Sequence, residues 1–482
     1  MTIRNACRGL SLLTACVLLI GCATDPVTGR PTLARSESWE IDQGARYHQE
    51  ILKQYQVYED PELQAYVDRI GQKLAKQSHR SHLNFTFTLL DSPEVNAFAL
   101  PGGYVYVTRG IMAYMTKESH LAGVIGHEIG HVSGLHGAER AAQQPIVAGA
   151  TLVVGVATGS GDLMQASQML GGALMSGYGR NQELESDALG AEYIAKTNYN
   201  PDDMIDVIGI LKNQELFARQ KAEEQGIAYQ GYHGLFSTHP RNDQRLQQVI
   251  REAAKYRDTA NPEPDDGEFL RLTNGMAYGQ SESQGIVRGN KFYHKDLDLY
   301  VEFPIGWQVI NQQAVLGAVS PDRTKVVQMQ MDSVAPPVNA GGYLQSKFGS
   351  VSNSQSVPTS EDQAVAAVAT QTDPNTGQQR SQLVGLVTRG GQAFVVSAAG
   401  KTYLPDQEFL SVTKSIRRLT KAEQPLARGR EIKLITAKRG DTIASLAAKS
   451  NLDEYAVEQI RLINNLYPNG EPQAGQAIKI IK

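Results

Sequence analysis

The chain has 482 residues, which is too long for one ordinary domain and predicts roughly three. Hydrophobic residues make up 41% of the chain, charged residues 20%, and the formal charge is -4, so composition offers no basic surface for nucleic acid. All three cysteines lie within the first 22 residues. The folded domains are therefore expected to contain no disulfide, no cysteine-ligated zinc and no thiol nucleophile.

The N-terminus predicts an export signal over residues 1–21. A short basic start precedes an apolar run at 10–20 that is too short for a comfortable membrane span. The end of this run, LIGC, resembles a bacterial lipobox, which implies cleavage before Cys22 and lipidation of that cysteine. Ala23 in place of an aspartate implies the outer membrane of a Gram-negative cell, so the chain is expected in the periplasm on the inner leaflet. The alternative is a plain signal peptide with an incidental cysteine.

Residues 22–40 carry prolines, glycine, threonine and serine without apolar periodicity, which predicts a lipidated tether. The first predicted domain covers residues 41–256. Within it, alternating apolar residues at 85–89 and 103–108 predict two half-buried strands, and a long helical stretch follows. The apolar, glycine-rich segment at 145–159 falls short of a membrane span and predicts a buried or surface-lying helix.

The segment HEIGH at 127–131 carries the strongest chemical signal in the chain. The apolar periodicity before it continues a helix into His127, and histidines four residues apart lie on one face of a helix. His127 and His131 can therefore bind one ion, with Glu128 directed at a water on that ion. Two histidines and a glutamate suit Zn2+ better than other divalent ions.

A zinc hydrolase needs a third protein ligand, and two regions offer one. His136 is one residue short of the metzincin spacing, and one residue rotates a side chain by roughly 100° on a helix. We therefore expect His136 to point away, as a surface or core histidine. The better candidate is a helical segment in which the carboxylates of Glu183 and Asp187 share a face. Glu185 is the rival ligand, about 200° round the helix from Glu183.

These motifs in combination resemble metallopeptidase family forty-eight, which includes the CAAX prenyl protease, heat-shock protease X and periplasmic quality-control proteases. The family pattern is HExxH followed at a distance by ExxxD on a second helix, and Glu183 and Asp187 match it. The resemblance implies a mainly helical zincin domain of the gluzincin type with a small sheet. It also implies one zinc ion per chain held by His127, His131 and Glu183, with Asp187 bracing a ligand and Glu128 as the catalytic base.

The segment at 96–103 resembles the family's strand and turn that can hold an extended peptide by strand addition. The glycine pair at its end would allow close approach of the backbone. The alternative is ordinary sheet structure. The resemblance assigns substrate binding to Asn96, Ala97, Phe98, Gly102 and Gly103.

The phrase FSTHPRNDQR at 236–245 resembles a family segment whose histidine can reach the metal. His239 has three interpretations: a fourth, inhibitory ligand in the resting enzyme, a residue that assists the transition state, or a loop histidine. Arg245, at the matching offset, is expected to pair with a site carboxylate or with the tetrahedral oxyanion.

A polar linker at 257–289 separates the first domain from two predicted C-terminal modules. Residues 290–420 predict an α+β module with a closing helix at 406–419, and FPIGW at 303–307 resembles the opening strand of PsbP/Mog1-like domains. Its predicted strands lie at 299–307, 325–331, 381–388 and 392–400.

Residues 431–482 have the pattern strand, helix, helix, strand. This pattern resembles a LysM domain, a small βααβ fold that binds N-acetylglucosamine polymers such as peptidoglycan, with an insertion at 468–473. The alternative is a LysM-shaped module that only packs on its neighbours.

The predicted function is that of a zinc-dependent endopeptidase of the bacterial periplasm, anchored to the outer membrane, that hydrolyses misfolded or misassembled envelope proteins. The alternative is a chaperone-like or cell-wall-binding protein with a latent zinc site. Glu128 argues against that alternative, because a purely binding protein needs no base beside its metal. A third interpretation makes peptidoglycan itself the substrate, although the strand beside HExxH favours a protein chain.

Overall fold

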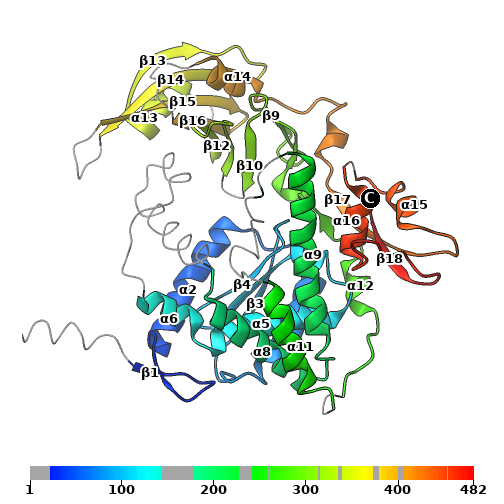
Figure 1. The fold of residues 1–482 in the computed structure, drawn as a ribbon. Helices are drawn as coiled ribbons and strands as arrows, with labels where there is room; N and C mark the ends of the chain where they lie inside the picture. Colours follow the sequence, from blue (N-terminus) through cyan, green and yellow to red (C-terminus); the bar gives the residue numbers. More distant parts are fainter. Residues whose placement is uncertain are drawn as a thin grey trace, which may run out of the picture.

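The computed structural model describes residues 22–143, 177–226, 229, 242–258, 261–312, 315–334, 339–372, 379–399, 406–452 and 454–482. Figure 1 shows three parts: a helical region at the bottom, a sheet-rich module at the top and a small module, coloured red, at the right. We call them the helical region (residues 37–258), the sheet module (286–416) and the C-terminal module (430–482).

A hairpin and a helix precede the rest of the helical region. They are β1 (Cys22–Thr24), β2 (Pro31–Leu33) and α2 (Glu37–Gln54). The carboxylate of Asp25 accepts two backbone N–H groups in the hairpin turn, and the hydroxyl of Ser36 caps α2. The structure thus differs from the irregular tether predicted over 22–40, because these side-chain caps order residues that have no apolar periodicity.

The helical region packs helices around one mixed sheet. Its other helices are α3 (Pro61–Ala75), α4 (Arg109–Met112), α5 (Glu118–Ser133), α6 (His136–Gln143), α8 (Arg180–Lys196), α9 (Asp203–Glu224) and α11 (Asn242–Ala254). In the sheet, β5 (Tyr104–Thr108) lies between β3 (Thr86–Leu90), which is parallel to it, and β4 (Ala97–Leu100), which is antiparallel. α5 packs on β4 and β5 and contacts α3, α8 and α9, so the helix that carries HEIGH lies inside the core.

Two short connecting elements flank the sheet module in the sequence: η1 (Glu282–Gln284) precedes it and η2 (Gln424–Ala427) follows it. One sheet consists of β7 (Ile286–Arg288), β8 (Lys291–His294) and β9 (Leu299–Glu302). The larger antiparallel sheet has the order β10-β11-β12-β16-β15-β14-β13. These strands are β10 (Gln308–Gln312), β11 (Val315–Val319), β12 (Val326–Ser333), β13 (Ser350–Ser356), β14 (Gln363–Thr372), β15 (Gln379–Arg389) and β16 (Gln392–Ala399).

Two helices cover this larger sheet, α13 (Ala340–Phe348) and α14 (Gln407–Ser415). The predicted α+β character is therefore confirmed, and β9, β12, β15, β16 and α14 fall on the segments predicted as strands and closing helix. The other strands of the large sheet and α13 were not predicted. The resemblance to PsbP/Mog1-like domains stays a prediction.

The C-terminal module has the predicted order strand, helix, helix, strand. Its elements are β17 (Arg430–Thr436), α15 (Ile443–Ala447), α16 (Ala456–Ile463) and β18 (Ala477–Ile481). The linker predicted at 257–289 is partly built into the same unit, because α12 (Glu268–Thr273) buries Phe269 and β6 (Ala277–Tyr278) pairs with β17. In the part of the chain that the structure describes, no helix is both long and apolar enough to cross a membrane.

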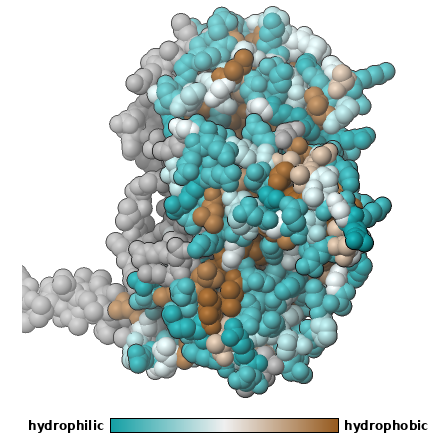
Figure 2. Space-filling model, turned by 45° about the vertical axis from the view of Figure 1, so that its right-hand side comes forward, coloured by the Kyte–Doolittle hydropathy of each residue, from teal (hydrophilic) through white to brown (hydrophobic). Residues whose placement is uncertain are grey.

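Hydrophilic residues cover most of the face shown in Figure 2, and hydrophobic residues form small separate groups on it. The segment at 145–159, predicted as an apolar helix, lies outside the described residues, as do the predicted export signal and His239.

Candidate metal centre

The metal-binding motif lies on α5, and every residue of this helix after Glu118 is buried. Leu121, Ile125 and Ile129 face the core and fix the rotation of the helix. His127 and His131 then project from the same side, and their Nε2 atoms lie 3.0 Å apart. Glu128, next to His127, is 1% exposed.

α8 brings Glu183 to the two histidines. Its carboxylate oxygens lie 3.6 Å from Nε2 of His127 and 3.5 Å from Nε2 of His131. The two helices approach closely because Gly130 faces Ser186: a Cβ on Gly130 would lie 3.0 Å from the Cα of Ser186. A larger residue at position 130 would push α8, and with it Glu183, away from the histidines.

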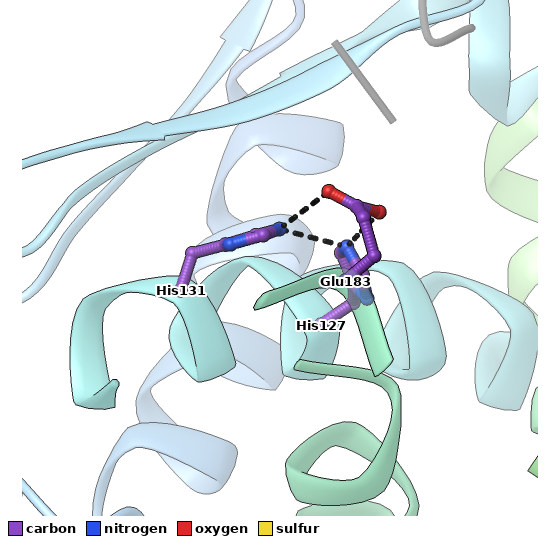
Figure 3. Close-up of side chains that lie close together, drawn as sticks. All are labelled: His127, His131 and Glu183. Carbon is purple, nitrogen blue, oxygen red and sulfur yellow. Dashed lines mark hydrogen bonds and ion pairs between the residues drawn. The ribbon is translucent and has the colours of Figure 1, made fainter. Parts of the chain in front are cut away.

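Figure 3 shows the Glu183 carboxylate above the two imidazoles, with all three side chains converging on one point. Ligands at 2.0–2.1 Å from a tetrahedral zinc ion lie roughly 3.3 Å from one another. The three separations between the side chains, 3.0, 3.5 and 3.6 Å, bracket this value. Two imidazole nitrogens and one carboxylate therefore fit a zinc site with a position left for water.

His127 is braced by a buried ion pair. Its Nδ1 lies 2.8 Å from the Oδ1 of Asp187, and Arg245 on α11 donates to both Asp187 oxygens at 2.7 and 2.8 Å. Arg245 also lies 3.1 Å from Glu183. Burial by itself raises the pKa of Asp187, but the charge and hydrogen bonds of Arg245 outweigh it and hold that pKa below its ordinary value. Arg245 thus pairs with two carboxylates of the centre.

His131 is braced by different groups. Its Nδ1 lies 2.9 Å from the Nδ1 of His136, whose Nε2 lies 3.3 Å from Glu185. Tyr178 stacks on the His131 ring at 3.7 Å, and Arg140 lies 3.9 Å from the centre of the Tyr178 ring. Burial raises the pKa of Tyr178 to about 12, so its hydroxyl is neutral at physiological pH.

The expectation that His136 points away from the centre is wrong, because its ring contacts His131, but His136 is a core histidine outside the ligand group, as expected. α5 ends at Ser133, and Leu135 adopts a left-handed backbone with φ of 58°, so the helical rotation between His131 and His136 does not apply. His136 begins a new helix, α6, and its ring folds back against His131. Glu185 likewise faces His136 and not the metal position.

The predicted substrate strand is β4, which lies at the edge of its sheet and contacts α5. The side chains of Ala97 and Phe98 are buried, and Phe98 stacks on Tyr106 at 4.7 Å. Asn96 precedes the strand and is half-buried. Gly102 and Gly103 both have positive φ, and a Cβ on Gly102 would lie 2.7 Å from the carbonyl oxygen of Glu40. The packing of α2 therefore requires glycine at 102 independently of any substrate.

A second group of possible ligands, which the sequence did not indicate, consists of His120, Asp203 and Asp206. The backbone N–H of Thr116 donates to Nδ1 of His120, and Nε2 of His120 lies 3.3 Å from Asp206. Lys117 places its ammonium between the two aspartates. A lysine already supplies the positive charge at this cluster, which ties the start of α5 to α9.

Comparison with known proteins agrees with this geometry. Residues 61–253 match the family model described as peptidase family M48, and residues 435–480 match that of the LysM domain. The chain contains a peptidase family M48 domain and a LysM domain. The family resemblance read from HEIGH and the Glu183 segment, and the LysM resemblance of the C-terminal module, are both confirmed.

Three curated relatives illustrate the similarity. The beta-barrel assembly-enhancing protease of Yersinia pestis is 27% identical over 255 residues, covering 51% of this chain and 50% of the relative. The protein of that name from Escherichia coli (strain K12) is 26% identical over 256 residues, with the same coverage. The mitochondrial metalloendopeptidase OMA1 of Schizosaccharomyces pombe is 30% identical over 203 residues, covering 41% of this chain and 56% of the relative.

The chain thus spans about half the length of the curated relatives that it matches. Among solved structures, a protein from Bacteroides thetaiotaomicron aligns with 41% of this chain and 87% of its own, at a TM-score of 0.24 and 11% identity. That score is too low to indicate a shared fold.

Proposed function

We propose that the chain is a zinc-dependent endopeptidase. The observation that carries the proposal is the convergence of His127, His131 and Glu183, with separations suited to one zinc ion, beside the buried carboxylate of Glu128. The peptidase family M48 domain and relatives named as metalloendopeptidases support it. His127, His131 and Glu183 would hold the ion, and Asp187 would orient His127 through its Nδ1.

A zinc ion bound here would activate water as a nucleophile near neutral pH and polarise the scissile carbonyl. Glu128 accepts the proton of the attacking water and then delivers it to the leaving amine. Arg245 contacts both Asp187 and Glu183, and its positive charge favours the ionised form of Asp187. An extended substrate would lie along the free edge of β4, from Asn96 to Phe98. We propose His239, in the segment before α11, as an inhibitory fourth ligand.

The proposed substrates are misfolded or misassembled envelope proteins. Two of the relatives are named as proteases that enhance β-barrel assembly, which supports this class of substrate. We propose that the chain acts in the periplasm and is held at the inner leaflet of the outer membrane by a lipid on Cys22. The LysM domain would bind peptidoglycan. We further propose the domain limits 41–256, 290–420 and 431–482, and a PsbP/Mog1-like fold for the sheet module.

The decisive experiment measures bound metal and casein cleavage side by side in the chain from Ala23 onward. Wild type is expected to carry about one zinc and to cleave casein. Glu128→Gln should keep the zinc and lose turnover, whereas His127→Ala should lose both. His239→Ala should cleave faster than wild type if His239 occupies the water position.

Equal cleavage by wild type and Glu128→Gln would contradict the mechanism. If both bind zinc and neither cleaves casein or unfolded envelope proteins, the chain is a binding protein with a latent site. Cleavage of peptidoglycan but not of protein would assign the substrate to the cell wall.

A further inference from the structure

We propose that His136 and Glu185 are positioning residues of the metal centre, which hold His131 in the tautomer and orientation that bind the ion. The proposal rests on the proposed function, because it takes His127, His131 and Glu183 as the ligands. The two residues form a chain with His131: Nδ1 of His131, the imidazole of His136 and the carboxylate of Glu185 follow one another at 2.9 and 3.3 Å.

Proton positions along this chain follow from the chemistry of imidazole. Nε2 of His131 faces His127 and Glu183, so a neutral His131 that binds an ion through Nε2 carries its proton on Nδ1. That proton points at Nδ1 of His136, which must then accept. The proton of a neutral His136 is therefore on Nε2, where the Glu185 carboxylate accepts it. Each N–H thus has an acceptor, and the hydrogen bonds run in one direction only, from His131 through His136 to Glu185.

Packing restrains the same two rings. His131 and His136 are each 1% exposed, and their ring centres lie 5.0 Å apart in an edge-to-face arrangement. Tyr178 covers the face of His131, so His136 fixes the edge of that ring and Tyr178 its plane. Ser186 also contacts Nδ1 of His136, at 3.3 Å, from the same helix that carries Glu185.

The backbone is shaped to allow this contact. A Cβ on Gly134 would lie 2.6 Å from Nε2 of His136, so the ring folds back only over a glycine. The left-handed Leu135 then reverses the chain direction between α5 and α6. Because of these two features, His136 packs against His131 across the break between α5 and α6. A continuous helix would have kept the two rings apart.

α8 consequently serves both histidine ligands. Glu183 is a ligand itself, Asp187 contacts His127 directly, and Glu185 reaches His131 through His136. Asp187 is fully buried and forms an ion pair with Arg245, whereas the Glu185 side chain is 33% exposed. Orienting partners of this kind change metal affinity by about 10- to 100-fold when removed.

The test compares zinc affinity, measured by competition with a chelator, among variants at position 136. His136→Leu removes the acceptor for His131 and should weaken zinc binding about 10- to 100-fold. His136→Asn keeps a side-chain oxygen near the place of Nδ1 and should restore affinity to within about 3-fold of wild type. Glu185→Ala should weaken zinc binding less than His136→Leu, because the Glu185 carboxylate is partly exposed and water can replace it as the acceptor for His136.

The matched control is His120→Leu. His120 is also 1% exposed, lies on the same helix and faces a carboxylate, Asp206, but it does not contact the three ligands. It should lower the unfolding temperature and leave zinc affinity unchanged. Cobalt absorption adds a readout of ligand geometry: His136→Leu should shift the visible spectrum of the Co2+-loaded protein, and His120→Leu should not.

Equal zinc affinity in wild type, His136→Leu and Glu185→Ala would overturn the inference while leaving the proposed function intact. Equal weakening by His136→Leu, His136→Asn and His120→Leu would also overturn it, since loss of packing would explain all three. If His136→Leu does not fold, the zinc affinities of His136→Asn and Glu185→Ala still test the inference. Absence of zinc from the wild type would instead refute the proposed function.

Discussion

The sheet module and the C-terminal module both follow the helical region in sequence, but they relate to it in opposite ways. The sheet module encloses its own hydrophobic clusters, one of which contains Phe394. The C-terminal module shares one continuous cluster with the helical region, which includes Ile125 of α5 together with Ile443 and Ile480. In Figure 1 the C-terminal module lies beside α9, while the sheet module lies beyond the end of the helical region.

Polar contacts reinforce the shared core. The ammonium of Lys479 is buried and donates to the carbonyl oxygens of Ala113 and Met115, at 2.5 and 2.6 Å, just before α5 begins. Asn465 donates to Thr116 in the same connection. The C-terminal module is therefore packed into the helical region as one structural unit. The segment that leads to α5 depends on this packing. The order of the modules in the sequence does not reveal which of them shares a core with the helical region.

The largest effect is expected from removing the C-terminal module by ending the chain at Gly429. Several fully buried isoleucines would be lost, each worth about 1.5–3 kcal/mol, against a typical total stability of about 5–15 kcal/mol. The helical region should then unfold at much lower urea concentration and lose zinc binding. Wild-type unfolding and zinc affinity in the truncated chain would show that the two units are independent.

A matched pair of phenylalanines tests the comparison within the full chain. Phe269 lies in the shared cluster and Phe394 in the sheet module, and both are 0% exposed. Each change to alanine should cost about 3–5 kcal/mol. Phe269→Ala should destabilise the helical region and weaken zinc retention, whereas Phe394→Ala should leave both unchanged.

The two tryptophans allow the regions to be followed separately, since Trp39 lies on α2 and Trp307 in the sheet module. Urea unfolding would be followed by fluorescence in a Trp307→Phe background for the helical region and in a Trp39→Phe background for the sheet module. If both alanine variants shift the urea unfolding midpoints of both regions equally, the two regions do not have separate cores.

Much of the centre could be predicted from the sequence because its geometry is helical. His127 and His131 on one face, and Glu183 with Asp187 on another helix, require only regular spacing. The C-terminal module was predictable for the same reason, since its four elements alternate clearly. The contact of His136 with His131 was not predictable, because it depends on a left-handed residue at Leu135, which local spacing does not reveal.

The unpredicted parts of the fold depend on contacts between distant segments. The docking of the C-terminal module joins Lys479 to residues more than 360 positions earlier. The hairpin at 22–33 depends on side-chain caps and has no apolar pattern. Neither kind of interaction leaves a periodic signal within a window of ten or twenty residues.

The next prediction concerns the pH dependence of the shared core. Burial lowers the pKa of Lys479 to about 7, although its two carbonyl acceptors favour the charged form. An unfolded lysine stays protonated up to about pH 10.4, so between the two values the unfolded chain binds more protons than the folded chain. The free energy of unfolding should therefore rise with pH above 7, by at most about 1.4 kcal/mol per pH unit.

The measurement compares wild type with Lys479→Met in urea at pH 6, 7, 8 and 9, so that other titrating groups cancel. Wild type should gain stability relative to Lys479→Met as the pH rises. A constant difference across the range would mean that Lys479 keeps its proton when folded.

The smallest effect should come from a single hydrogen bond across the interface. The hydroxyl of Tyr467 donates to Oε1 of Gln220 on α9, at 2.9 Å, and Tyr467→Phe removes that bond while keeping the ring against Phe217. Loss of one such bond should cost about 0.5–1.5 kcal/mol. Gln220→Ala should cost a similar amount, and the double variant little more than either, since both remove the same bond. Additive losses would mean that α9 and the C-terminal module meet through packing alone, and that the shared apolar cluster, with Lys479, accounts for their union.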